Sequence, residues 1–245
     1  PDSLRLLLDM KDGSDYTEDY ADFSTTFRIQ DCSVSWTDDD YCPDNPPIGG
    51  YKYFPTVGRD TTKLGKFNYR SGSTDVLGWV LEEASGQPLA KLISEYLWKP
   101  MGAEYDAFIT VDESGFALGS RGMNSALRDL GRLGLLVMNK GMAFDQQVIP
   151  AEFIKDLHTQ PGDPYWPYES ALEDQPYYRS FWWGEGNKER DLSGVGIHGQ
   201  SLRVASEAGI VIALYSSWPR ADGDNNDQYW DKNSELLSII TNKFR

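Results

Sequence analysis

The pattern of apolar and polar residues predicts helices in the first two thirds of the chain. The clearest helix runs from Ser73, a good N-cap residue, to Gly86, where the pattern stops. Between them, apolar residues recur at helical spacing. They are Val76, Leu77, Val80, Leu81 and Ala84.

Further segments repeat this periodicity. One covers residues 89–97 and ends before Pro100 and Gly102, a second covers residues 124–141, and a third begins at Pro150. The apolar segment of residues 4–10 predicts a short buried helix of about two turns. Residues 14–66 are rich in Asp, Tyr, Pro and Gly without sustained periodicity. They indicate a long irregular region, either the border of a cleft or a simple surface loop.

The last part of the chain has the character of a sheet. The segments "YYRSFWWG", "GIHGQSLRV" and "GIVIALYSS" are aromatic or β-branched and are separated by turns that contain Gly, which predicts an antiparallel meander. The segment "NSELLSIITNKF" predicts a closing helix that packs on this sheet. The expected class is α/β, more closely α+β, with helices and loops over about 1–170 and the sheet with its helix over about 176–245.

Composition and charge narrow the class of partner. The 245 residues are 40% hydrophobic, which is enough for a sizeable core. The net charge of -15 disfavours nucleic acid and anionic membrane surfaces, which need clustered Lys and Arg. A small neutral or cationic molecule is the expected substrate. Cys32 and Cys42 lie close in a polar loop, as a disulfide or as two free thiols, so a periplasmic, secreted or cytoplasmic location stays open.

The usual catalytic and metal-binding motifs are absent from the sequence. It has no Gly-x-Ser-x-Gly, no Ser followed three residues later by Lys, and only two histidines, His158 and His198. No zinc-ligand spacing is present, and "DGDNND" at residues 222–227 is a poor calcium loop. Glycine-rich phosphate motifs are also missing. We expect no metal and no organic cofactor.

Four segments resemble, in order, consecutive blocks of the serine β-lactamase-like family. They are "LRLLLDMKDG", "FNYRSGSTDVLGWVLEEASGQPL", "LRDLGRLGLLVMNKG" and "GIHGQSLRV". The family includes class C β-lactamases, DD-peptidases, esterases and 6-aminohexanoate-dimer hydrolases, and "GIHGQ" and "DYTEDYADF" resemble the last group most. The resemblance implies a β-lactamase/DD-peptidase-like fold, an antiparallel sheet flanked by helices plus a helical subdomain. Because the family's nucleophile belongs to a Ser-x-x-Lys segment that would precede Pro1, the N-terminal part is expected to be missing.

The resemblance also implies roles for particular residues. Tyr69 matches the tyrosine that shuttles protons, and such a phenol needs a nearby cation to favour phenolate. Ser71 stands where class C enzymes have Asn, and it is expected to bind substrate. Tyr20, in "DYTEDYADF", is a further substrate-binding candidate. The alternative is that Tyr69 is a half-buried loop residue without a catalytic role.

The "GVGIHG" turn matches the family's Lys-Thr-Gly region only in part. Gly194 stands at the Lys position, Val195 at the Thr position and Gly196, a substrate-binding candidate, at the Gly position. Loss of the Lys argues against substrates with a penicillin-like carboxylate. The backbone N–H of Ile197 is the catalytic oxyanion-hole candidate. His198 either lines the pocket or is a structural residue.

The expected function is hydrolysis of small esters or amides through an acyl-enzyme, with 6-aminohexanoate-oligomer-like amides as one substrate class. The chain alone is expected to be inactive because it lacks the nucleophile. Its expected partners are the substrate and the missing N-terminal segment of the same protein, with the oligomeric state open. The alternative is a non-catalytic ligand-binding relative of the same fold.

Overall fold

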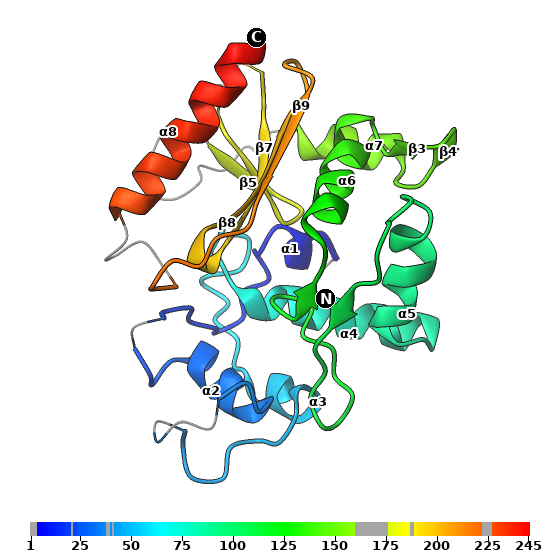
Figure 1. Cartoon of the computed structure of the whole chain (residues 1–245). Helices are drawn as coiled ribbons and strands as arrows, with labels where there is room; N and C mark the ends of the chain where they lie inside the picture. The colour runs from blue at the N-terminus through cyan, green and yellow to red at the C-terminus, as the bar shows by residue number, and fades with distance from the viewer. Residues whose placement is uncertain are drawn as a thin grey trace. The chain divides into compact units, whose positions relative to one another are not determined.

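The computed structural model describes residues 4–20, 22–37, 40, 42–159, 176–186, 189–221 and 227–245. The chain forms two compact units. One comprises Pro1–Ile93 with Ala107–Asn124, and the other comprises Ser94–Asp106 with Ser125–Arg245. The first unit carries the blue, cyan and first green segments of Figure 1, and the second carries the sheet and α8.

The first unit is built mostly from helices. Its elements are α1 (Leu4–Leu8), α2 (Thr26–Ser33), α3 (Gly50–Tyr53), η1 (Phe54–Thr56), α4 (Ser71–Ser85), α5 (Leu89–Ile93), and the antiparallel pair β1 (Phe108–Ile109) and β2 (Met123–Asn124). The short helix predicted at residues 4–10 is present as α1, but none of its residues is fully buried.

Helix α4 begins three residues earlier than the sequence predicts. Arg70 occupies the N-cap position, so the prediction of Ser73 as N-cap is wrong. The Ser73 hydroxyl instead donates a hydrogen bond of 2.5 Å to Asp12, inside the first helical turn. The predicted end is confirmed, because Gly86 closes the helix in the left-handed conformation at φ 66°.

The region 14–66, predicted as irregular, contains helices and supplies much of the core of the first unit. Five of its aromatic and aliphatic side chains pack with Phe116 and Leu118. They are Tyr16, Phe27, Val34, Tyr53 and Phe54. Helix α2 shows no apolar periodicity because several of its buried residues, including Gln30 and Asp31, are polar. The region also lines a pocket of about 210 Å³ beside the first turn of α4.

The second unit contains the predicted antiparallel meander, which is confirmed. Its strands are β5 (Tyr177–Arg179), β6 (Trp182–Gly184), β7 (Leu192–Gly196), β8 (Gln200–Ala205) and β9 (Ile210–Leu214), paired in that order. The remaining elements are η2 (Ser94–Trp98), α6 (Leu127–Met138), β3 (Met142–Ala143), β4 (Gln146–Gln147), α7 (Ala151–Leu157), η3 (Ile197–Gly199) and α8 (Asp227–Phe244). The predicted helix over 89–97 is therefore α-helical to Ile93 and π-helical in η2.

Helices α6 and α8 lie against opposite faces of the sheet (Figure 1). On the α6 side, Gly134 approaches the sheet so closely that a Cβ there would lie 2.4 Å from Val211. On the α8 side, Asn233 donates a hydrogen bond to Ser201. Because successive residues of a strand point to opposite faces, Leu202 and Val204 of β8 join the apolar layer under α6.

The division of the chain differs from the expected division near residues 170–176. Helices α6 and α7 belong to the same compact unit as the sheet. The core under α6 joins Val137 of α6 and Ile154 and Leu157 of α7 to Leu192 and Val204 of the sheet. These two helices therefore pack on the sheet and share its core.

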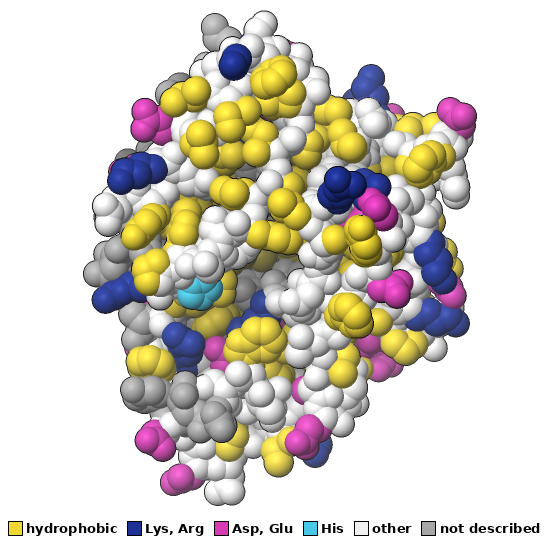
Figure 2. Space-filling view, in the orientation of Figure 1, with side chains coloured by type: hydrophobic (Ala, Val, Ile, Leu, Met, Phe, Trp, Pro, Cys, Tyr) yellow, Lys and Arg dark blue, Asp and Glu magenta, His cyan; other side chains and the backbone are white. Residues whose placement is uncertain are grey.

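Cys32 and Cys42 form a disulfide, with their Cα atoms 5.6 Å apart, which settles one of the two alternatives that the sequence left open. On the face shown in Figure 2, basic and acidic side chains are interspersed. No described helix is long and apolar enough to cross a membrane. Across the described ranges, no group of three His, Cys, Asp or Glu residues could hold a metal ion. Most of the weak calcium-loop candidate, residues 222–226, lies outside those ranges.

Candidate functional site

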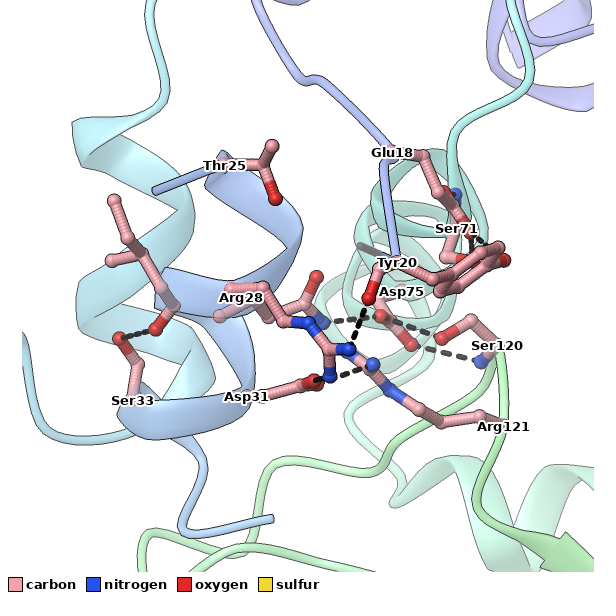
Figure 3. A network of polar contacts seen from close by, with 12 residues as sticks. Glu18, Tyr20, Thr25, Arg28, Asp31, Ser33, Ser71, Asp75, Ser120 and Arg121 are labelled. Carbon is pink, nitrogen blue, oxygen red and sulfur yellow. Dashed lines mark hydrogen bonds and ion pairs between the residues drawn. The ribbon is translucent and has the colours of Figure 1, made fainter. Parts of the chain in front are cut away.

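The first unit brings three of the predicted site residues together around Glu18. Ser71, the first residue of α4, donates two hydrogen bonds to the Glu18 carboxylate, one from its backbone N–H and one of 2.5 Å from its hydroxyl. The Tyr20 hydroxyl donates a bond of 2.6 Å to the same carboxylate. Figure 3 shows Glu18 and Tyr20 facing Ser71 at the beginning of the helix. A carboxylate at this position also complements the positive end of the helix dipole.

Tyr69 lies directly before α4, half-buried and close to Glu18 and Ser71. Burial raises the pKa of the Tyr69 phenol, and the negative charge of Glu18 raises it further, while a hydrogen bond with the Ser71 side chain lowers it. Burial and Glu18 also raise the pKa of Tyr20. Both phenols are therefore neutral at pH 7. In this setting Tyr69 can donate a hydrogen bond, but it needs a nearby positive charge to lose its proton and act as a base.

Arg70 does not direct its charge toward this group. Its side chain is fully buried, and Nη1 donates a hydrogen bond of 3.2 Å to the Met10 carbonyl and lies 3.7 Å from Asp12. Burial opposes ionisation of Asp12, yet hydrogen bonds from Ser73 and Ser14 and the charge of Arg70 together lower the pKa of its carboxyl. This ion pair ties the residue that follows Tyr69 to Asp12, in the segment after α1.

A polar network between α2 and α4 holds the segment that carries Tyr20. Arg28 donates a hydrogen bond to the Tyr20 carbonyl and pairs with Asp31 at 3.4 Å. Asp31 also pairs with Arg121, whose guanidinium lies over the Phe27 ring. Figure 3 shows the two guanidinium groups converging on Asp31.

A second part of this network fixes α4 itself. Asp75 of α4 is fully buried and accepts hydrogen bonds from Gln30 at 2.7 Å and from the backbone and hydroxyl of Ser120, both at 2.9 Å. Burial raises the pKa of its carboxyl, against the lowering effects of Arg121 and these donors. Gln30 in turn accepts a bond of 2.5 Å from Tyr16. The helix that begins at Ser71 is thus anchored four residues into its length.

The other predicted site residues belong to the second unit. Gly194, Val195 and Gly196 end β7, and Ile197 begins the tight turn η3 with its side chain 40% exposed. His198 adopts φ 57°, and its ring nitrogen Nδ1 lies 2.7 Å from the Trp218 carbonyl.

The turn has a second contact with Trp218. Gly199 adopts φ 84°, and a Cβ there would lie 2.3 Å from the Trp218 indole. The backbone N–H of His198 donates to the Ala221 carbonyl, and that of Trp218 donates to the His198 carbonyl. These contacts hold the His198 ring and backbone in a fixed position in the turn.

Glu18 is the residue that the sequence reasoning missed. It lies two residues before Tyr20 in the same acidic-aromatic segment. An acid there gives no local signal, because its partner Ser71 is 53 residues away in the sequence.

A sequence model of the Beta-lactamase family matches residues 51–234. The chain belongs to this family. It is 33% identical over 228 residues to a 6-aminohexanoate-dimer hydrolase of Paenarthrobacter ureafaciens, covering 90% of this chain and 56% of that protein. The chain thus spans little more than half the length of this relative.

Two solved structures share the fold. A putative 6-aminohexanoate-dimer hydrolase from Bacillus anthracis superposes with a TM-score of 0.73 at 22% identity, covering 96% of this chain and 62% of that one. A penicillin binding protein from Bacillus halodurans superposes with a TM-score of 0.61 at 16% identity, covering 95% and 72%. The β-lactamase-like fold and the α/β class expected from the sequence are thereby confirmed.

Proposed function

We propose that the chain is part of a serine hydrolase that cleaves small esters or amides through an acyl-enzyme. The supporting observation is the group at the beginning of α4, where the Tyr69 phenol lies beside the Ser71 hydroxyl and both lie beside Glu18. Family membership supports hydrolase chemistry, and the relative from Paenarthrobacter makes 6-aminohexanoate-like amides a reasonable substrate class.

In this proposal Tyr69 passes a proton between the nucleophile and the leaving group. A phenol whose pKa is raised by burial and by Glu18 needs a positive charge beside it to accept a proton. The chain has no Ser-x-x-Lys, so both the nucleophile and this cation would come from a segment outside these 245 residues. The backbone N–H of Ile197 would stabilise the oxyanion, with Gly196 and His198 beside the substrate.

The sheet supports a polypeptide partner of this kind. β9 is the last strand in the order of the described sheet, and its five residues are all half-buried and mostly apolar. Figure 2 shows hydrophobic side chains gathered in the area where Figure 1 places β9. An edge strand offers N–H and C=O groups for pairing with another strand. We propose that a further segment of the same protein pairs with β9.

The turn before β8 bears on substrate choice. Gly194 has no side chain that could bind a carboxylate, although it stands where the resemblance places a Lys. The enzyme would therefore prefer neutral short esters or amides to benzylpenicillin in kcat/KM. Efficient turnover of benzylpenicillin would contradict this preference.

Hydrolysis of p-nitrophenyl acetate tests the proposal. The 245-residue chain should be inactive, whereas the complete gene product, expressed from its own start codon, should turn over. Tyr69→Phe in the complete protein should lower kcat by about 10²-fold or more. Tyr51→Phe is the matched control, since it removes another phenol near a carboxylate, one that donates a hydrogen bond of 2.8 Å to Glu82. A near-normal kcat in Tyr69→Phe would remove Tyr69 from the mechanism.

The second candidate is a ligand-binding relative without catalysis. The observation that favours it is the anionic neighbour of Tyr69, which on its own makes phenolate harder to form. A complete gene product without a Ser-x-x-Lys, or one that binds neutral amides without turnover, would support this candidate.

A further inference from the structure

The sheet face under α8 is unusually polar for a covered surface. Trp183, Ser193 and Arg203 are register partners across β6, β7 and β8, so they form one row on the same face. Ser193 and Arg203 are 4% and 8% exposed. Burying a polar side chain costs free energy unless it is hydrogen-bonded. The polar groups of this face that still lack a partner therefore indicate which ligand it could bind.

Helix α8 contributes the opposite side of this space, with two polar side chains between two apolar ones. Trp230, Asn233, Ser234 and Leu237 follow the i, i+3, i+4, i+7 spacing of one helix face and line the same space as the row on the sheet. Asn233 is 8% exposed. Together the two surfaces line an open pocket of about 360 Å³, at the lower end of the range for small-molecule sites.

The charges in this pocket already balance. Arg203 Nη2 donates a hydrogen bond of 2.6 Å to Glu185, and the Ser193 hydroxyl donates to the other oxygen of that carboxylate. A charged ligand would add a charge without a partner to this largely covered ion pair. The pocket therefore suits a neutral molecule.

Several hydrogen-bonding groups remain available. Arg203 Nε is buried and has no hydrogen-bond partner within the described part of the chain. The Ser201 hydroxyl accepts a bond of 3.1 Å from the amide nitrogen of Asn233, which leaves the hydroxyl hydrogen to donate and the Asn233 amide oxygen to accept. The site thus offers two donors and one acceptor, with the indoles of Trp183 and Trp230 at its walls.

We propose that this pocket binds a small neutral planar amide, such as a lactam or a cyclic urea. The ligand carbonyl accepts hydrogen bonds from Arg203 Nε and Ser201, and its N–H donates to the Asn233 amide oxygen. The flat body of the ligand packs against the two indoles. This site lies in the second unit, and it does not depend on the proposed hydrolase activity.

Tryptophan fluorescence with 2-piperidinone as the probe tests the proposal. The lactam should change the emission of the 245-residue chain saturably at millimolar concentration, and N-methyl-2-piperidinone, which lacks the N–H, should bind about tenfold more weakly. Equal binding of the two lactams, or no saturable change with either, would overturn the proposal.

Variants locate the binding. Asn233→Leu should weaken binding about tenfold, while Asn242→Leu, an exposed site on the same helix, should leave it unchanged. If circular dichroism shows that Asn233→Leu is unfolded, Trp183→Leu serves as the second test, because it changes the sheet side of the pocket. Unchanged affinity in the folded variants would refute the site. Binding by the chain but not by the complete gene product would show that polypeptide fills the pocket, which also overturns the proposal.

Discussion

Glu18 accepts hydrogen bonds from both the backbone N–H and the hydroxyl of Ser71, 53 residues further along the chain. This contact places a negative charge at the N-terminus of α4, because Ser71 is the first residue of the helix. The Tyr69 phenol lies close to both of these residues. The stability of the helix terminus and the protonation of the phenol are therefore coupled through one carboxylate.

Glu18→Gln should destabilise the protein by about 0.5–2 kcal/mol, because the helix loses a charged acceptor at its N-terminus. Chemical denaturation of both forms measures this difference. Glu83→Gln is the matched control, since Glu83 is an exposed acid on α4 that accepts a hydrogen bond from the Trp79 indole. Equal stability of Glu18→Gln and the parent would show that water replaces the cap at no cost.

The same substitution should lower the pKa of the Tyr69 phenol. Glu18 raises this pKa by its negative charge, so neutralising the carboxylate makes phenolate easier to form. The difference in alkaline absorbance titration between each protein and its Tyr69→Phe variant isolates this one tyrosine. A Tyr69 titration that does not move toward lower pH would mean that its phenol does not sense Glu18.

Gly134→Ala should destabilise the second unit by about 1–3 kcal/mol, because the new Cβ would meet Val211 at 2.4 Å and force α6 away from the sheet. Gly131→Ala on the same helix is the control, since nothing lies within 4 Å of its Cβ position. There the better helix propensity of Ala should stabilise by about 0.5–1 kcal/mol. Thermal melts that place both variants on the same side of the parent would contradict the close packing.

His158 should make stability depend on pH. Burial lowers the pKa of its imidazole below the unfolded value, and this effect outweighs the hydrogen bond with the Arg190 backbone, which raises the pKa. The folded state therefore disfavours the protonated ring, and this contribution is complete above about pH 6.5 and is lost as the pH falls through the folded pKa. His158→Gln should flatten the slope of unfolding free energy between pH 7 and pH 5. An unchanged slope would assign the dependence to other groups.

Removing the Cys32–Cys42 disulfide should lower the stability of the first unit by about 2–3 kcal/mol, the loop entropy expected for a sequence separation of 10. Denaturation of the Cys32→Ser, Cys42→Ser double variant measures this loss. The parent under reducing conditions should match it, and a reduced parent as stable as the oxidised one would contradict the prediction.

The strands and the long amphipathic helices could be read from the sequence because apolar residues recur in them at strand or helix spacing. Helix α2 could not, since its buried positions include Gln30 and Asp31, which are satisfied by Asp75 and Arg121 far along the chain. The start of α4 shows the same limit, because Ser73 has the ideal side chain for a cap but its hydroxyl binds Asp12.

Helix α8 shows that periodicity can also mislead about orientation. Leu236 and Ile239 make its segment look amphipathic, yet they are 50% and 59% exposed, while Asn233 and Thr241 are buried. The helix begins at Asp227, six residues before the segment that the apolar pattern marked. Polar residues that find partners across a sheet leave no signal in hydrophobic periodicity.

The alternation along β8 also bears on how the sheet finds its correct alignment. Ser201 and Arg203 face the polar pocket under α8, while Leu202 and Val204 face the apolar layer under α6. A slip of one residue between β7 and β8 would drive the Arg203 guanidinium into that apolar layer and turn two aliphatic side chains toward Glu185. Such a misaligned sheet would be penalised on both faces at once. The two unlike faces of β8 thus both favour the native register of the β7–β8 pair during folding.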